Sequence, residues 1–223
     1  SIEVVKGPAA AVLTYAPANL SSDAGVNTIT LGTAADIITV GANFTSSTLS
    51  ISLGETAAAD VINTIDASAY TGVLTVVAVG IALGSTSPDV LTGTTKLTDT
   101  LSLSGVVADL TTVTDFETIL VNADTTTTMT IVTGNVADND LLTIDGTAIT
   151  TATKVLTVNL QAETDGQITV LGGAGADVIT LSAAGATANI SGGLGNDTIN
   201  GVAFLAGTQT MDGGAGANIL NVT

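Results

Sequence analysis

The amino-acid sequence predicts an all-β chain folded as a parallel β-solenoid, a β-roll or β-helix whose coils stack along one axis. Three observations predict it. Short runs alternate Val, Ile or Leu with Thr or Ser, the period-two pattern of a half-buried strand. Gly, Asn, Asp and Ser interrupt these runs about every ten residues. Related phrases recur along the chain, as they do where stacked units share one core.

Five alternating runs are the clearest strand candidates. They are Asn27–Leu31, Thr48–Leu53, Thr100–Leu103, Thr128–Val132 and Val155–Leu160. Their β-branched residues pack well on a pleated surface. The best helical window, Val107–Glu117, is weak, so we expect strands throughout.

Glycine density divides the chain into three expected parts. Residues 1–25 are an extended N-terminal segment or cap, and residues 26–163 form a degenerate β-strand-repeat solenoid. Glycine becomes denser in residues 164–223, which we expect to form a β-roll. Because Ser1 is not an initiator Met, we expect a processed product or one window of a longer polypeptide.

The composition excludes several function classes. Of 223 residues, 45% are hydrophobic, whereas three are Lys or Arg and 20 are Asp or Glu, giving a formal net charge of −17. No basic surface is left for phosphates, so we expect neither nucleic acid nor an anionic membrane as a partner. The longest apolar stretch, residues 73–83, is too short to insert in a bilayer.

Catalytic side chains are equally scarce. The chain has no His, Cys or Arg, and its Lys residues are scattered, which leaves nucleophilic and general-base chemistry without its usual groups. Paired carboxylates could hydrolyse glycosides, but the aromatic platforms that usually hold sugars are missing. We therefore predict that the chain is not an enzyme.

A nine-residue motif, G-G-x-G-x-D-x-U-x with U a large apolar residue, recurs near the carboxyl end. It starts at Gly172 and Gly192 with every specified position filled, and at Gly213 with Asn218 in place of Asp. Glycines let the backbone turn its carbonyls inward, the Asp adds a charged oxygen, and Ca²⁺ takes six to eight such ligands. Starts 20 and 21 residues apart fit one coil, so we expect one column of turns with two calcium sites between them.

With this motif, residues 165–221 resemble the RTX (repeat-in-toxin, haemolysin-type) calcium-binding proteins, whose fold is a parallel β-roll. The resemblance implies a β-solenoid with calcium-binding RTX turns in its C-terminal part, and carboxylate and carbonyl ligands to Ca²⁺. The implied metal-site residues are Gly172, Gly173, Gly175, Asp177, Gly192, Gly193, Gly195, Asp197, Gly213, Gly214, Gly216 and Asn218. Two departures matter. Family motifs usually repeat every nine residues, whereas residues 182–190 here lack the Asp, and the neutral Asn218 predicts a weaker last site.

Looser copies of the motif occur earlier in the chain. They carry Asp36, Asp89 and Asp99, which we expect to be solvated turn carboxylates or Asx-type turn residues rather than metal ligands. An EF-hand is not predicted around Asp140, because the central Gly and the final Glu of that loop are missing.

The remaining sequence resembles β-strand-repeat proteins of bacterial surfaces, including RTX-type S-layer proteins. Together the resemblances imply a secreted, extracellular structural protein of the bacterial cell surface, a calcium-dependent subunit that self-assembles into a surface layer or fibre. Its expected partners are further copies of itself, with cell-surface polysaccharide as a second candidate. The alternative is a calcium-binding RTX module of a secreted adhesin, toxin or hydrolase whose active part lies outside this chain.

Overall fold

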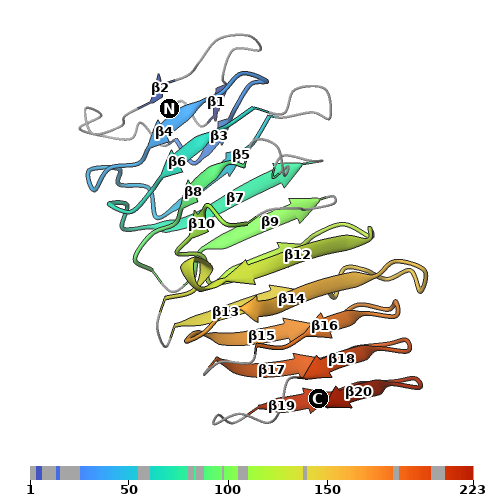
Figure 1. Ribbon diagram of the computed structural model, residues 1–223. Helices are drawn as coiled ribbons and strands as arrows, with labels where there is room; N and C mark the ends of the chain where they lie inside the picture. The colour runs from blue at the N-terminus through green and yellow to red at the C-terminus, as the bar shows by residue number, and fades with distance from the viewer. Residues whose placement is uncertain are drawn as a thin grey trace.

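The computed structural model confirms an all-β parallel solenoid (Figure 1). It describes residues 4–6, 14–15, 26–54, 61–79, 83, 88–96, 98–104, 110–137, 140–182, 186–201 and 209–222. The strands stack from the N-terminal coils at the top of Figure 1 to β20 at the bottom. In this described part of the chain, no helix has the length and apolar character needed to cross a membrane.

Odd-numbered strands form one ten-stranded parallel sheet, here called the long sheet. Its strands are β1 (Val4–Lys6), β3 (Thr28–Thr30), β5 (Thr48–Ser52), β7 (Val73–Val79), β9 (Thr100–Ser104), β11 (Thr118–Val121), β13 (Leu141–Asp145), β15 (Gln167–Leu171), β17 (Thr187–Ser191) and β19 (Thr210–Asp212). Each coil therefore adds one strand to this sheet.

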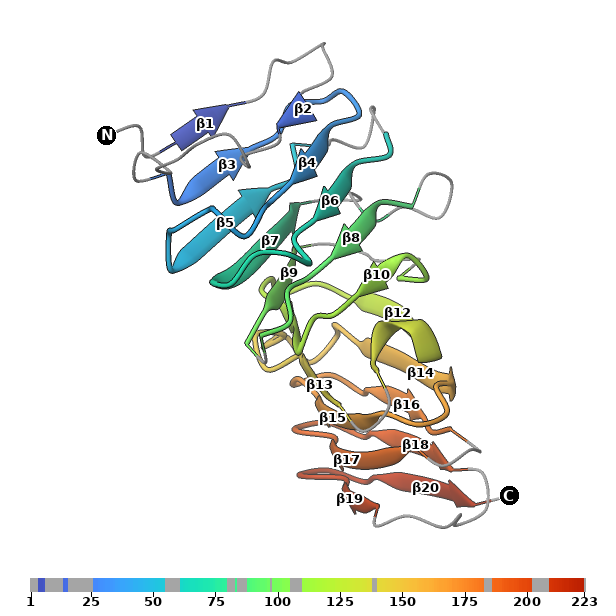
Figure 2. The same ribbon diagram turned by 90° about the vertical axis from the view of Figure 1, so that its left-hand side faces the viewer.

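Even-numbered strands form two five-stranded parallel sheets. The first short sheet holds β2 (Thr14–Tyr15), β4 (Ile37–Thr39), β6 (Thr64–Asp66), β8 (Val90–Thr92) and β10 (Val113–Thr114). The second short sheet holds β12 (Thr127–Val132), β14 (Leu156–Ala162), β16 (Val178–Thr180), β18 (Thr198–Gly201) and β20 (Ile219–Val222). Figure 2 shows the second short sheet continuing the stack below the first.

The core lies between the long sheet and the short sheets, because alternate residues of each strand point inward. In the long sheet one inward column is in register through eight coils and is buried throughout. Its members are Ile29, Ile51, Val76, Leu101, Ile119, Ile144, Val170 and Ile190. Burying each such side chain contributes about 1.5–3 kcal/mol, so like residues stacked on like residues hold the register.

The strand predictions are confirmed, and the described part of the weak helical window is not helical, as expected. The five predicted runs are β3, β5, β9, β12 and β14. Residues 110–117 hold turns and β10, and the one helix among the described residues is a single 3₁₀ turn, Thr133–Asn135. A short Thr-rich window with β-branched residues follows the strand preference.

The change from the first short sheet to the second, between β10 and β12, was not predicted. β10 and β12 do not pair, while β9, β11 and β13 continue the long sheet past them. The buried Asn135 ties the two levels together. Its Nδ2 donates to the carbonyls of Leu110 (2.5 Å) and Val113 (2.7 Å), and its Oδ1 accepts from the Val132 N–H (2.7 Å).

The expected boundary at residue 163 stays a prediction. Strand pairing crosses it on both faces, β13 with β15 and β14 with β16. Of the expected N-terminal segment, 1–25, only β1 and β2 lie within the described residues.

Candidate metal centre

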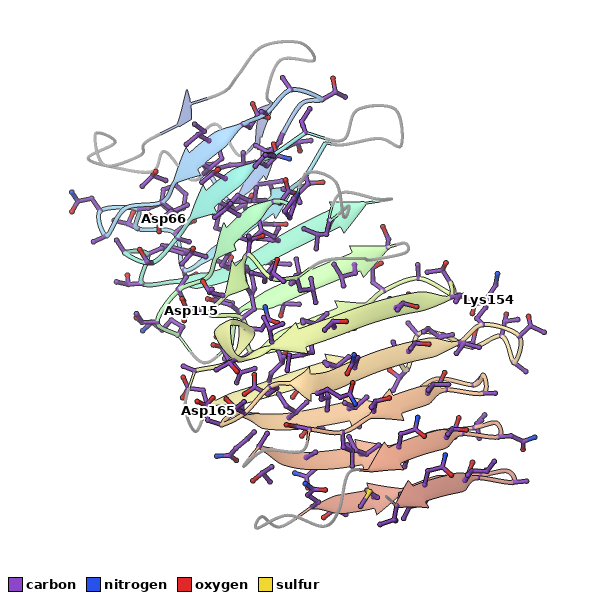
Figure 3. All side chains as sticks on the ribbon, in the orientation of Figure 1. Asp66, Asp115, Lys154 and Asp165 are labelled. Atoms are coloured by element: carbon purple, nitrogen blue, oxygen red, sulfur yellow. The ribbon has the colours of Figure 1, made fainter. Side chains whose placement is uncertain are left out.

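The three glycine turns lie in one column at the edge where the long sheet leads into the second short sheet. They stand below Lys154, labelled in Figure 3, whose carbonyl lies against Gly175. Leu194 donates its N–H to the Gly173 carbonyl (2.9 Å), and Ala215 donates to the Gly193 carbonyl (2.8 Å). A 20- or 21-residue spacing thus brings the motifs together, as one coil per motif requires.

Glycine is needed here because each turn lies directly on the next. A Cβ added at Gly195 would overlap the Gly175 carbonyl oxygen, and one at Gly216 would overlap the Gly195 oxygen. Both residues also have left-handed backbone, with φ of 115° and 132°, which side-chain-bearing residues rarely adopt. The motif glycines are therefore fixed by close stacking of the turns.

The motif carboxylates point into the turns and form a hydrogen-bonded ladder between coils. Asp177 and Asp197 are fully buried. Oδ1 of Asp177 accepts from the Leu156 N–H (2.7 Å), and Oδ1 of Asp197 accepts from the Asp177 N–H (2.8 Å). Asn218 continues the pattern by accepting from the Asp197 N–H (2.9 Å). Each side chain thus satisfies a backbone amide of the preceding coil.

The second oxygens of the two aspartates differ. Asp177 Oδ2 accepts from the Gly173 N–H in its own turn (2.7 Å). The next turn is built differently, because Gly193 has a φ of 95°, whereas Gly173 has no positive φ. Asp197 Oδ2 is buried and accepts no hydrogen bond from any described residue.

Asn218 shows which hydrogen bonds a side chain can form at this position of the motif. Its Nδ2 donates to the Gly214 carbonyl (3.1 Å) in a turn where Gly214 also has positive φ, 74°. Asp197 occupies the equivalent place one coil earlier, since β18 and β20 pair with Thr198 opposite Ile219. A carboxylate oxygen cannot donate a hydrogen bond, so the Asp197 turn lacks the N–H₂ donor that the Asn218 turn contains.

Burial makes this arrangement costly at neutral pH. Desolvation raises the pKa of Asp177, and the nearby charge of Asp197 acts in the same direction against the hydrogen bonds from Leu156 and Gly173. Desolvation also raises the pKa of Asp197. A buried carboxylate is stabilised by a proton or by a cation at its oxygen.

The residues fit a hard cation best in the second turn. Asp197 Oδ2 offers a carboxylate oxygen that accepts no hydrogen bond from the residues described. Carboxylate and main-chain carbonyl oxygens are the ligands that Ca²⁺ prefers. Asp177 is committed to two backbone amides instead, so the two complete motifs are not equivalent.

The earlier aspartates belong to two further ladders, which corrects their expected role as solvated turn residues. Asp36, Asp89 and Asp99 are buried. Asp36 Oδ2 accepts from the Gly32 N–H four residues back (3.1 Å), as Asp177 does from Gly173. Asp99 accepts from the N–H groups of Leu74 (2.8 Å) and Thr94 (2.6 Å). Backbone amides, which carry partial positive charge, take the place of solvent.

Sequence reasoning missed two ladder members, Asn63 and Glu117. Asn63 Oδ1 accepts from the Asp36 N–H (3.0 Å), and the Asn63 N–H donates to Asp89 Oδ1 (2.6 Å). Glu117 Oε2 accepts from the Asp99 N–H (2.8 Å). The available signal was position, because each stands directly before a Thr-Ile pair that opens a strand, as Asp197 does.

Comparisons with known proteins add no family to these findings: no family model matches the sequence, and neither a curated protein nor a solved structure is significantly similar to it.

Proposed function

We propose that the chain is a calcium-dependent structural protein of the bacterial exterior, a subunit that self-assembles into a surface layer or fibre. The observation that carries the proposal is Asp197 Oδ2, a buried anionic oxygen with no hydrogen-bond donor in a glycine turn. The RTX-like motif around it names Ca²⁺ as the cation. The absence of Cys and the strong acidity agree with a secreted protein held together by metal.

Calcium would act by compensating charge. Among the residues that the structure describes, six carboxylates are buried, Asp36, Asp89, Asp99, Glu163, Asp177 and Asp197, in a chain of net charge −17. A cation that binds only the stacked turns stabilises the folded state by RT ln(1 + [L]/Kd), about 2.7 kcal/mol at a hundredfold excess over Kd. Asp197 Oδ2 and the carbonyls of the neighbouring turns would hold it. The chain would then fold fully where calcium is abundant, outside the cell.

Apolar side chains of β20 are exposed. Ile219, Leu220 and Val222 of β20 are 54%, 47% and 52% exposed, whereas Ile199, which pairs with Leu220, is 4% exposed. The backbone of a sheet edge offers unpaired N–H and C=O groups to another strand.

A calcium titration followed by circular dichroism tests the metal part of the proposal. We expect β-structure and resistance to denaturant to increase with calcium, and Asp197→Ala to raise the calcium needed. Asp165→Ala, an exposed carboxylate with the same charge change, should leave the midpoint unchanged. An identical midpoint for wild type and Asp197→Ala would contradict the site.

Electron microscopy tests the assembly part. With millimolar calcium we expect ordered sheets or fibres, and with chelator dispersed molecules. A monomer under both conditions that binds cells or glycans would instead favour the module of a secreted adhesin.

A further inference from the structure

A polar cavity of about 240 Å³ lies away from the glycine turns, at the level where the first short sheet ends. Four connections line it: Ser68 follows β6, Thr94 and Lys96 follow β8, Asp115 and Glu117 join β10 to β11, and Asp140 precedes β13. In Figure 3 Asp115 lies on the opposite edge of the stack from Lys154. The cavity is thus separate from the candidate metal centre.

The cavity walls are fixed by hydrogen bonds to the backbone. Glu117 Oε2 accepts from the Asp99 N–H (2.8 Å), and the Thr94 N–H donates to the buried Asp99 Oδ2 (2.6 Å). The Lys96 N–H donates to Thr94 Oγ1 (2.9 Å). These bonds fix the side chains of Glu117 and Thr94, so a ligand would contact these two without the entropic cost of ordering them.

The lining chemistry and the size point to one ligand class. Ser68 and Thr94 offer hydroxyls, Asp115, Glu117 and Asp140 offer carboxylates, and Lys96 is the single cation. Carboxylates outnumber ammonium groups, which favours a positively charged ligand. The volume exceeds the roughly 30 Å³ of one water and is below the roughly 300 Å³ at which pockets for drug-sized molecules begin. A molecule the size of one sugar residue fits these limits.

We propose that this cavity binds a small hydroxylated primary amine, an amino-sugar-like molecule whose ammonium group lies among Asp115, Glu117 and Asp140. Its hydroxyl groups would contact Ser68, Thr94 and Lys96. The proposal rests on the cavity alone and does not depend on calcium binding or on self-assembly.

The charge of Glu117 would make binding pH-dependent. Burial, opposed by the hydrogen bond from the Asp99 N–H and assisted by the charges of Asp99 and Asp115, raises the pKa of Glu117 to about 7. Among the described lining residues, Asp140 and Lys96 are the other charged groups. The ionised form prevails above this pKa, so an ammonium ligand should bind up to about tenfold more tightly at pH 8 than at pH 6.

Calorimetric titration of the full chain with a matched pair of compounds tests the proposal. The probe is glucamine, which stays protonated over this pH range, and its neutral counterpart is the sugar alcohol glucitol. We expect glucamine to bind at least about tenfold more tightly than glucitol. Equal affinity for the two compounds, or no glucamine binding at pH 8, would overturn the proposal.

Three variants locate the binding. Glu117→Gln should weaken glucamine binding about tenfold at pH 8 and abolish its pH dependence. Asp115→Asn should also weaken it, and Asn tolerates the positive φ of Asp115, 59°, so the fold is kept. Asp165→Asn removes an exposed charge outside the cavity and should change nothing. Unchanged binding in folded Glu117→Gln and Asp115→Asn would exclude this cavity.

The titrations should be run with chelator and with calcium. Glucamine binding in both, together with a flat calcium titration, would leave this inference standing while removing the proposed metal centre. Loss of glucamine binding in both, with a normal calcium response, would do the reverse.

Discussion

The substitution Asp197→Asn should change the sign of its effect on stability when calcium is added. Asn keeps Oδ1 as the acceptor for the Asp177 N–H and replaces the unpartnered Oδ2 by an N–H₂ donor. Asn218 already shows this arrangement one coil later, with Nδ2 donating to the Gly214 carbonyl. Without calcium the variant should therefore be more stable than wild type.

The expected magnitudes follow from the contacts. Removing a buried oxygen that has no donor relieves about 1–3 kcal/mol, so we expect Asp197→Asn to stabilise the calcium-free protein by about 1–2 kcal/mol. At a hundredfold excess of calcium over Kd the wild type gains about 2.7 kcal/mol. A variant without the anionic ligand gains little, and the order of stability reverses by about 1 kcal/mol.

Denaturant unfolding followed by circular dichroism, with chelator and with calcium, measures both signs. Hydrogen exchange at the Thr198 and Ile219 amides, which donate across the ladder coils, localises the effect. Asp177→Asn is the matched control. Its two oxygens accept from Leu156 and Gly173, so either orientation of an amide sets one N–H₂ against a backbone N–H and destabilises under both conditions.

The reasoning would be refuted if Asp197→Asn destabilised the calcium-free protein as much as Asp177→Asn does. That result would mean that Asp197 Oδ2 has a donor in solution. If Asp197→Asn stabilised the protein equally with and without calcium, the hydrogen-bonded ladder would be supported and the calcium site would be contradicted.

Three further predictions concern pH, the steric limits of the glycine turns and the change from the first short sheet to the second. With chelator, the free energy of unfolding should decrease as the pH rises from 4.5 to about 7, because in this window the folded state holds a proton on Glu117 that the unfolded state has released. Glu117→Gln should remove this part of the pH dependence. Gly216→Ala should lower the free energy of unfolding, measured with denaturant, by more than about 1 kcal/mol. Gly134→Ala, where a Cβ meets nothing within 4 Å, should change this free energy by less than about 0.5 kcal/mol. Asn135→Ala removes three hydrogen bonds to the backbone and should lower the free energy of unfolding by about 2–4 kcal/mol, measured by thermal unfolding; an unaffected midpoint would show that water replaces the side chain.

The parts of the fold that depend on local pattern were predictable. Alternation in runs such as Thr48–Leu53 gives one buried and one exposed face whatever lies elsewhere in the chain. The column of glycine turns was predictable because its coils have almost equal length, so the motif start itself marks the coil. Nothing comparable marks the level at which β10 ends one short sheet and β12 begins the next.

The position before a Thr-Ile pair marks several ladder residues, but which residues pair was not predictable in the earlier ladders, because the partners are far apart at unequal spacing. Asp36 contacts Asn63 across 27 residues, whereas Asp99 contacts Glu117 across 18. Composition rules expect a lone turn Asp to be solvated. In this chain the amide of a neighbouring coil stabilises the carboxylate instead, and that amide is brought there by the fold.

Unequal coil length has a consequence for engineering. Neighbouring ladder residues stay in contact whether 18, 21 or 27 residues separate them, so the extra residues are accommodated in connections outside the paired strands. Peptide epitopes or enzyme-recognition tags could accordingly be grafted into such a connection while the ladder residue that opens the next strand keeps its neighbours. The protein would then serve as a scaffold that displays foreign segments at intervals set by the strand spacing, about 4.8 Å per coil.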